Sequence, residues 1–226
     1  MRRLVILLFI IVICLFHTNE IDAQELSVDL YGGVITYQGD LVDGLVDFAE
    51  IQPAFGAGIK YLWFKDIAVR GSVLVGKISG DDANSEKLAS RGYSFESNIT
   101  ELSIAVEYHP LGQGRWSNRN ELIKSISPYV FAGVGYMFGE PTVTGLPSTS
   151  EDLLNDITSR LVVPFGIGVQ ATFSEKYYVA FEGGTRYLTD DYLDGVSISG
   201  NPKANDWYPT VGLKIGFFLG GEPSMF

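Results

Sequence analysis

Side-chain character alternates along short stretches of this sequence, and this alternation constrains the fold more than any other feature. In residues 51–63, apolar side chains take every odd position from Ile51 to Trp63, while small or polar residues and one lysine take most even positions. Residues 160–173 and 207–218 repeat the pattern. Successive side chains of a β-strand point to opposite faces, so this period of two predicts strands with one large apolar face and one small or polar face.

The chain contains eight such segments, at residues 26–37, 51–63, 67–79, 97–108, 127–138, 160–173, 177–188 and 207–218. Each is long enough for a tilted strand that spans a bilayer, which takes roughly 9–11 residues. A soluble barrel or sandwich buries its large apolar side chains and keeps a polar exterior. Here the small face is rich in glycine, which suits a narrow and crowded interior. We therefore expect the large apolar face to point outward, toward lipid.

Aromatic residues gather near the ends of these segments, where membrane barrels carry interfacial girdles. They are Tyr61, Trp63, Tyr108, Tyr136, Tyr177, Tyr187 and Trp207. Backbone groups in lipid must all be hydrogen-bonded, so the sheet has to close on itself. The sequence therefore predicts an all-β domain over residues 24–226, an eight-stranded antiparallel up-and-down transmembrane β-barrel of OmpA/OmpX-like size.

The first twenty-three residues have the order of a secretory signal peptide. Arg2 and Arg3 precede an unbroken apolar run of thirteen residues, and small Ala23 stands before Gln24 at the expected cleavage site. An uncleaved membrane helix is the alternative, but thirteen residues fall short of the roughly 20 that span a bilayer. We therefore expect export, removal of residues 1–23, and a location in the outer membrane of a Gram-negative bacterium.

The predicted connections differ in length. Residues 64–66 and 174–176 are typical of tight turns, and short turns face the periplasm in barrels of this kind. The long connections, which we expect as outer loops, are residues 38–50, 80–96, 139–159 and 189–206. Residues 109–126 then form a periplasmic link of unusual length. Residues 150–157 could form a short helical turn within the third outer loop.

Charged residues at inward-facing positions are the candidate functional residues of the barrel interior. Reading the alternation inward gives four acids and four bases: Asp29, Lys60, Arg70, Glu101, Glu107, Glu182, Arg186 and Lys214. A buried charge is unfavourable unless it is paired, and a balanced set can form ion pairs. Eight strands leave room only for side chains or one small ligand, so we expect a filled lumen; a proton or ion path is the alternative. In a filled lumen, Arg186→Leu would leave an acid such as Glu182 unpaired.

Charge and histidine content exclude several functions. The formal net charge is −11 and the sequence has no basic stripe, which argues against nucleic-acid binding. Barrel hydrolases need a histidine near the outer rim as general base. His17 lies in the predicted signal peptide and His109 on the predicted periplasmic side. We therefore expect no enzymatic activity, no cofactor and no metal site.

Five stretches, in order along the chain, carry a family resemblance. They are Tyr37-Gln38-Gly39-Asp40-Leu41, then Ala68-Val69-Arg70-Gly71 with Ile78-Ser79-Gly80-Asp81, then Arg91 to Ile99 with Glu101-Leu102-Ser103, then Val163 to Gly168, and finally Asp191 to Ser197. Together they resemble an uncharacterised family of outer-membrane β-barrels from the Bacteroidota. That family includes PorG, a component of the type IX (Por) secretion system.

The resemblance implies a non-enzymatic barrel that anchors periplasmic secretion-system lipoproteins to the outer membrane. The basic link holds the candidate partner contacts Arg115, Trp116 and Arg119. We also expect contact with outer-membrane lipid and with the barrel-assembly machinery, because Phe217-Phe218 at the end of the last segment resemble its recognition signal. The alternative is a surface barrel whose outer loops bind host or matrix, as in adhesins. A carrier of lipophilic ligands is disfavoured by the inward charges.

Overall fold

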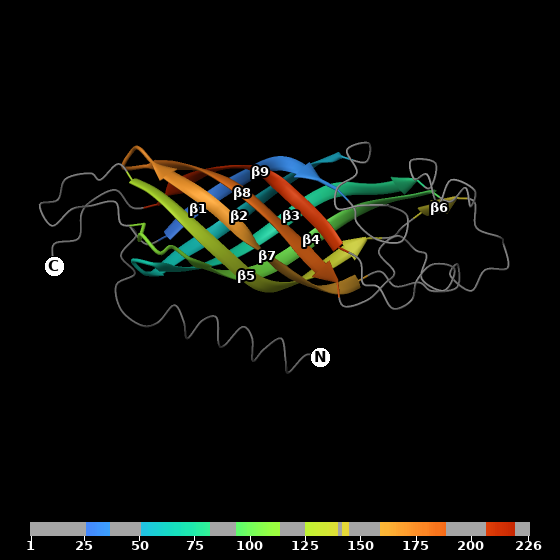
Figure 1. The fold of residues 1–226 in the computed structure, drawn as a ribbon, viewed down its shortest axis with the longest axis horizontal. Coiled ribbons are helices and arrows are strands. Elements are labelled where there is room, and N and C mark those ends of the chain that lie inside the picture. Colours follow the sequence, from blue (N-terminus) through green and yellow to red (C-terminus); the bar gives the residue numbers. More distant parts are fainter. Residues whose placement is uncertain are drawn as a thin grey trace, which may run out of the picture.

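Eight antiparallel strands close into a barrel (Figure 1). The computed structural model describes residues 26–36, 51–81, 94–113, 125–139, 142–144, 159–188 and 207–219. The barrel strands are β1 (Leu26–Ile35), β2 (Gln52–Phe64), β3 (Ile67–Asp81), β4 (Ser94–Tyr108), β5 (Ser125–Gly139), β7 (Ser159–Thr172), β8 (Tyr177–Leu188) and β9 (Trp207–Phe218). Each of the eight predicted segments overlaps one of them, so the predicted fold class is confirmed.

Each barrel strand pairs with its neighbours in sequence, and β1 pairs with β9 to complete the ring. The closing register runs from Ser27 opposite Phe218 to Ile35 opposite Thr210. All the pairings are antiparallel. Closure leaves no sheet edge within the barrel wall, which is the condition for placing strands in lipid.

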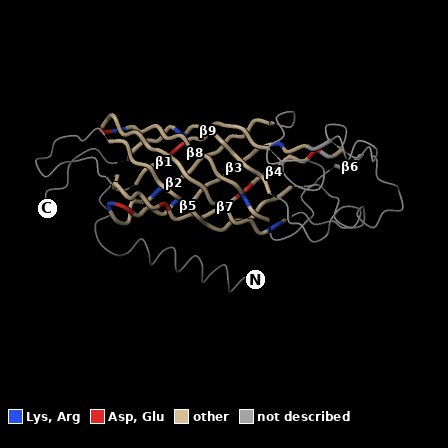
Figure 2. The backbone as a smooth tube through the Cα atoms, viewed as in Figure 1, with Lys and Arg blue, Asp and Glu red and all other residues tan. Residues whose placement is uncertain are grey.

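The alternation along the strands separates an apolar outside from a mixed inside. On β2, Phe55, Ile59 and Trp63 expose about 60% of their surface, whereas Ala54 and Lys60 are buried. This is the reverse of a soluble barrel and matches an exterior in contact with lipid. Charged residues are sparse along the strands of the barrel (Figure 2). Of the outward-facing side chains described on the strands, the charged ones are Lys77 and Glu96, which pair with each other at 2.8 Å.

The two ends of the barrel differ. The turns at 65–66, between β2 and β3, and at 174–176, between β7 and β8, lie at the end that we call the turn side. The opposite end, the loop side, carries a ninth short strand, β6 (Thr142–Thr144), on the right in Figure 1. The predicted tight turns are therefore present and share one end.

Outward aromatic side chains ring both ends. Tyr61, Trp63, Tyr108 and Tyr177 are exposed near the turn side, and Tyr136 is exposed near the loop side. Also near the loop side, the Trp207 ring lies edge-on to Tyr187, with 4.8 Å between ring centroids. The predicted aromatic residues thus form two belts that bracket the apolar surface, as at the two interfaces of a bilayer.

A three-stranded extension projects from the loop side. The last β2–β3 pair is Ala54 with Gly76, but β3 and β4 stay paired as far as Asp81 with Ser94. There β6 adds to the other side of β4. The sequence did not predict β6, because three residues are too few for a recognisable period of two. The helical turn expected at 150–157 lies outside the described residues.

The loop-side half of the interior contains a large apolar cluster, and at the positions of this cluster the expectation of a small, polar or charged inner face is wrong. A buried cluster fills this half: Tyr31, Ile35, Ala54, Leu74, Ile78, Ile99, Met137, Val162, Leu188 and Tyr208. On β3 and β5 these inward residues stand between outward apolar ones, as in Val73-Leu74-Val75. The period of two disappears where both faces are apolar, which is why the cluster could not be predicted from the alternation.

In the part of the chain that the structure describes, no helix combines the length and hydropathy needed to cross a bilayer.

Candidate functional site

The eight inward charges predicted from the alternation all lie inside the barrel, and none exposes more than 6% of its surface. Most of them gather in the turn-side half. This turn-side network consists of Asp29, Lys60, Arg70, Glu107, Glu182 and Lys214. Glu101 and Arg186 form a separate pair closer to the loop side.

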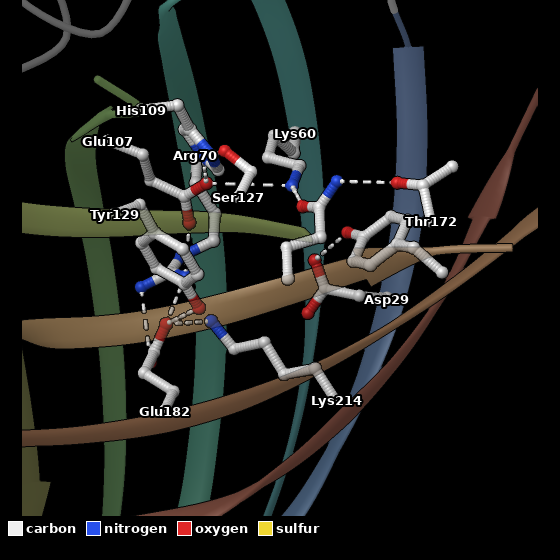
Figure 3. A network of polar contacts seen from close by, with 12 residues as sticks. Asp29, Lys60, Arg70, Glu107, His109, Ser127, Tyr129, Thr172, Glu182 and Lys214 are labelled. Carbon is white, nitrogen blue, oxygen red and sulfur yellow. Dashed lines mark hydrogen bonds and ion pairs between the residues drawn. The ribbon is translucent and has the colours of Figure 1, made fainter. Parts of the chain in front are cut away.

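Glu182 is the centre of the turn-side network (Figure 3). The Arg70 guanidinium donates to Glu182 Oε2 at 2.7 Å and the Tyr129 hydroxyl donates to the same oxygen at 2.8 Å. The Lys214 ammonium forms an ion pair with this oxygen as well. Arg70 also pairs with Glu107 on the neighbouring strand β4. Four strands, β3, β5, β8 and β9, therefore meet at one carboxylate.

Lys60 connects this centre to β1 and β7. Its ammonium donates to Gln170 Oε1 at 2.6 Å, lies 3.5 Å from the Glu107 carboxylate, and sits 4.3 Å above the Tyr178 ring centroid. The Tyr178 hydroxyl donates to Asp29 at 3.4 Å. Three bases then face three acids, so the network carries no net charge. Neutrality of this kind is what allows charges to be buried.

Glu101 is the partner of Arg186. The Arg186 Nε donates to Glu101 Oε2 at 3.1 Å, and the Tyr208 hydroxyl donates to the same oxygen at 2.9 Å. The expected pairing of Arg186 with Glu182 is therefore wrong. Both residues lie on β8, four positions apart, which separates them by about 13 Å along a strand. Arg186 instead reaches across the lumen to β4.

Glycines on the inner face make room for the aromatic rings of the network. A Cβ atom added at Gly168 would lie closer than 3.0 Å to three atoms of the Tyr129 side chain, two of them ring carbons, and one at Gly216 would meet three ring carbons of Tyr178 in the same way. The inner glycines noted in the sequence thus serve a packing role. They let flat rings lie directly against the barrel wall.

Gly168→Ala is expected to lower the free energy of unfolding by about 1–3 kcal/mol, the usual effect of overpacking. The added methyl group displaces the Tyr129 ring and with it the hydrogen bond to Glu182. Urea unfolding of the barrel refolded in phospholipid vesicles measures the change. The matched control is Gly183→Ala, because a Cβ there meets only Val211, at 3.8 Å. Equal stability of the two variants would contradict this account of the inner glycines.

His109 belongs to the network, although sequence reasoning placed it in a periplasmic link. It follows β4 directly and is fully buried. Its backbone N–H donates to the Asp66 carbonyl at 2.7 Å, and the N–H of Gln113 donates to the Lys65 carbonyl at 2.8 Å. Residues 109–113 therefore fold back against the β2–β3 turn. The alternation did contain the signal, because His109 continues the inward series of Glu107 by two positions.

The His109 ring joins β4 to β5. Its Nδ1 lies 3.0 Å from the Ser127 hydroxyl and its Nε2 lies 3.3 Å from the Glu107 carboxylate. The ring stacks on Tyr129 with 4.8 Å between centroids. Burial lowers the pKa of His109, which favours the neutral ring. A neutral ring donates from Nε2 to the carboxylate and accepts at Nδ1 from the hydroxyl.

Ser127, His109 and Glu107 have the order of a nucleophile, base and acid in acyl-transfer enzymes. Their exposures are 1%, 0% and 2%, so a substrate carbonyl has no access to the Ser127 hydroxyl in this arrangement. The three residues therefore act as internal packing, with each polar atom hydrogen-bonded to the next.

Arg160 is a further inward charge that the sequence reading missed. Only 3% of it is exposed, and it donates to the Gly139 carbonyl at 3.2 Å near the loop side. Arg160 is the first residue of the sixth predicted segment, so no residue of the segment precedes it from which its face could be predicted by alternation. Gln170, Tyr129 and Tyr178 were also missed, because neutral polar side chains were not included among the inward candidates.

A small cavity of about 20 Å³ lies between the two charged groups. Arg70, Glu101 and Tyr31 are among its lining residues. The Arg70 Nε, Glu101 Oε1 and Tyr31 hydroxyl atoms have no hydrogen-bond partner among the described residues. A volume of this size holds one water molecule, which can both accept from the guanidinium and donate to the carboxylate.

Other predicted site residues lie outside the described residues. They are the candidate partner contacts Arg115, Trp116 and Arg119 and the candidate cleavage residues Ala23 and Gln24. Among the described side chains, no group of three or more His, Cys, Asp and Glu residues is placed to hold a metal ion.

Several solved structures share this fold. Neisserial surface protein A (NspA) aligns with a TM-score of 0.53 at 9% identity, over 86% of this chain and 97% of that chain. A major outer membrane protein from Thermus thermophilus gives 0.46 at 14% identity, over 85% and 98%. The attachment invasion locus protein Ail of Yersinia pestis gives 0.45 at 11% identity, over 85% and 96%. The match to NspA shows that the chain has the fold of a small outer-membrane barrel.

Comparison of the sequence with known proteins gives one family. No curated protein matches the chain. A family model described as "Domain of unknown function (DUF6089)" matches residues 6–226. This match covers nearly the whole sequence, including every barrel strand, and the chain therefore belongs to the DUF6089 family.

Proposed function

We propose that this protein is a non-conducting, non-catalytic barrel of the outer membrane that serves as a rigid anchor for protein contacts. The observation that carries the proposal is the filled interior. Ion pairs and aromatic rings occupy the turn-side half, and a packed apolar cluster occupies the loop-side half. A barrel filled in this way offers its two ends, and not its lumen, for function.

The same interior argues against a pore and against catalysis. Between the charged groups the cavity measures about 20 Å³, room for one water molecule and no continuous path. The arrangement of Ser127, His109 and Glu107 is buried on all sides by neighbouring strands and by residues 109–113. The lipophilic-carrier alternative is disfavoured too, because the apolar cluster is packed at 0–9% exposure.

Planar phospholipid bilayers are expected to show no stepwise current when the purified barrel is inserted. The apolar cluster on the loop side is made mostly of hydrocarbon side chains, which cannot replace the hydration shell of an ion. Single-channel recording checks this, with a general porin as the positive control for insertion. Reproducible open-channel steps from the folded protein would contradict the proposed filled lumen.

The proposed location rests on two observations. The described exterior is an apolar surface between two aromatic belts, which suits a bilayer. Residues 1–23 have the order of a cleavable export signal. Sucrose-gradient fractionation of native membranes tests the location, and N-terminal sequencing of the mature protein tests cleavage between Ala23 and Gln24.

For the partner, we propose a periplasmic lipoprotein of a type IX secretion machine. The support is the resemblance of the sequence stretches quoted above to the barrel family that includes PorG. Residues 109–113 fix the start of the basic link beside the β2–β3 turn, and the candidate contacts Arg115, Trp116 and Arg119 follow within this link in the sequence. Crosslinking and affinity purification from native cells test this. The double variant Arg115→Glu/Arg119→Glu should lose the crosslinked partner while the barrel still folds.

The β3–β4–β6 extension favours a second candidate, a surface barrel that binds host or matrix molecules. Its strands continue beyond the barrel wall on the side opposite the short turns. Deleting residues 140–158 removes β6 but leaves β5 and β7 complete. Under this alternative the deletion abolishes attachment of whole cells to matrix proteins, whereas an anchor for periplasmic partners is unaffected.

A further inference from the structure

The outer surface of the barrel has an apolar depression of about 510 Å³ over β1, β2 and β3. Its floor is formed by the small outward residues Ala57 on β2 and Gly71 on β3. In the register of these two strands, Ala57 lies opposite Val73 and Gly71 lies opposite Ile59. Its walls include Leu30 and Phe217. The depression therefore arises where two small outward residues adjoin larger side chains on four neighbouring strands, β9, β1, β2 and β3.

We propose that this depression holds one acyl chain of a phospholipid. The inference rests on the proposed membrane location, since only a barrel in a bilayer presents this surface to lipid. The lining residues lie toward the turn side: Val28 is the third residue of β1 and Phe217 is next to the last of β9. If the short turns face the periplasm, this half of the barrel lies in the inner leaflet, which places a phospholipid there.

An acyl chain fits this surface better than a second copy of the protein does. A two-fold dimer brings the same patch of both subunits together, so two depressions would face each other and leave a void. A void loses the dispersion contacts of its lining atoms. A flexible hydrocarbon chain can instead follow the shape of the floor between the Leu30 and Ile59 side chains.

The headgroup is expected to contribute little to selectivity. The turns nearest the depression each contain one acid and one base, Asp66 with Lys65 and Glu175 with Lys176. Neither turn therefore presents a net charge to a headgroup. The site is expected to accept zwitterionic and anionic phospholipids alike and to be selective for the chain.

Native mass spectrometry tests the proposal on the full mature barrel. The protein is refolded in vesicles of phosphatidylethanolamine and phosphatidylglycerol, extracted in mild detergent, and weighed with its retained lipid. Wild type is expected to keep one phospholipid. Gly71→Leu fills the floor and is expected to lose it, and Ala57→Leu is expected to do the same. Exchanging phosphatidylglycerol for phosphatidylcholine should leave retention unchanged.

The matched control is Gly32→Leu. Gly32 and Gly71 both face outward, and a Cβ added at either meets nothing within 4 Å, but only Gly71 lines the depression. Gly32→Leu is therefore expected to keep the lipid. Retention by Gly71→Leu, equal loss in Gly32→Leu, or a wild-type dimer that Gly71→Leu dissociates would each overturn the proposal. A folded barrel without lipid overturns this site alone, whereas failure to fold into vesicles overturns the membrane location as well.

Discussion

Glu182→Gln is expected to lower the free energy of unfolding by about 3–5 kcal/mol, the range for breaking a buried ion pair. Arg70, Lys214 and Tyr129 all converge on one oxygen of this carboxylate. The glutamine amide has nearly the same size as the carboxylate but no charge. The three bases of the turn-side network then face only two acids, Glu107 and Asp29. The turn-side half of the lumen then carries an uncompensated positive charge among buried side chains.

Urea titration in phospholipid vesicles, followed by tryptophan fluorescence, measures this loss. The control is Glu96→Gln, which breaks the exposed Lys77–Glu96 pair and should change stability by less than about 1 kcal/mol. A second variant, Glu182→Gln/Lys214→Met, removes the excess positive charge and is expected to recover part of the loss. If Glu182→Gln were as stable as wild type, Glu182 could not be the centre of the network.

Arg186→Leu is expected to lower the free energy of unfolding by about 3 kcal/mol, because it leaves the Glu101 carboxylate buried without a cation. Glu101 exposes 1% of its surface and keeps only the Tyr208 hydroxyl as a donor. Its other oxygen already lacks a partner among the described residues. The isolated charge therefore has no compensation within the lumen.

The double variant Arg186→Leu/Glu101→Leu separates charge from packing. Both positions border the apolar cluster of the loop side, so two leucines are expected to restore most of the stability. A double-mutant cycle on urea unfolding gives the coupling energy of the pair. The cycle also discriminates between partners, since Arg186 and Glu182 should show much weaker coupling than Arg186 and Glu101.

The strands were predictable where the environments of the two faces differ. On β2, the face toward lipid carries large apolar residues such as Phe55 and Ile59, and the face toward the crowded lumen carries small residues such as Gly56 and Gly58. The period of two follows from this difference. The same logic places Lys60 in the interior. Fold class, strand number and the candidate inward charges could be derived in this way because each depends only on the local pattern.

The contacts inside the lumen could not be derived, because they depend on how the strands are staggered around the ring. Glu101 and Arg186 lie on strands that are not neighbours. Nothing in the sequence of either segment tells how far along the barrel axis one residue lies relative to the other. His109 was missed for a different reason: β4 ends at Tyr108, as predicted, and the inward series was not continued past the end of the strand. On β5, Tyr136-Met137-Phe138 is apolar on both faces and contains no directional signal.

The pairing of β1 with β9 has a consequence for biogenesis. Ser27 and Phe218 lie opposite each other in the closing register, although almost the entire domain separates them along the chain. Until β9 has been delivered, β1 and β8 are both open edges that other chains can extend. The ring can thus be completed only once the whole domain is present, and a chain truncated before Trp207 is expected to aggregate or be degraded and not to insert into a membrane as a smaller barrel.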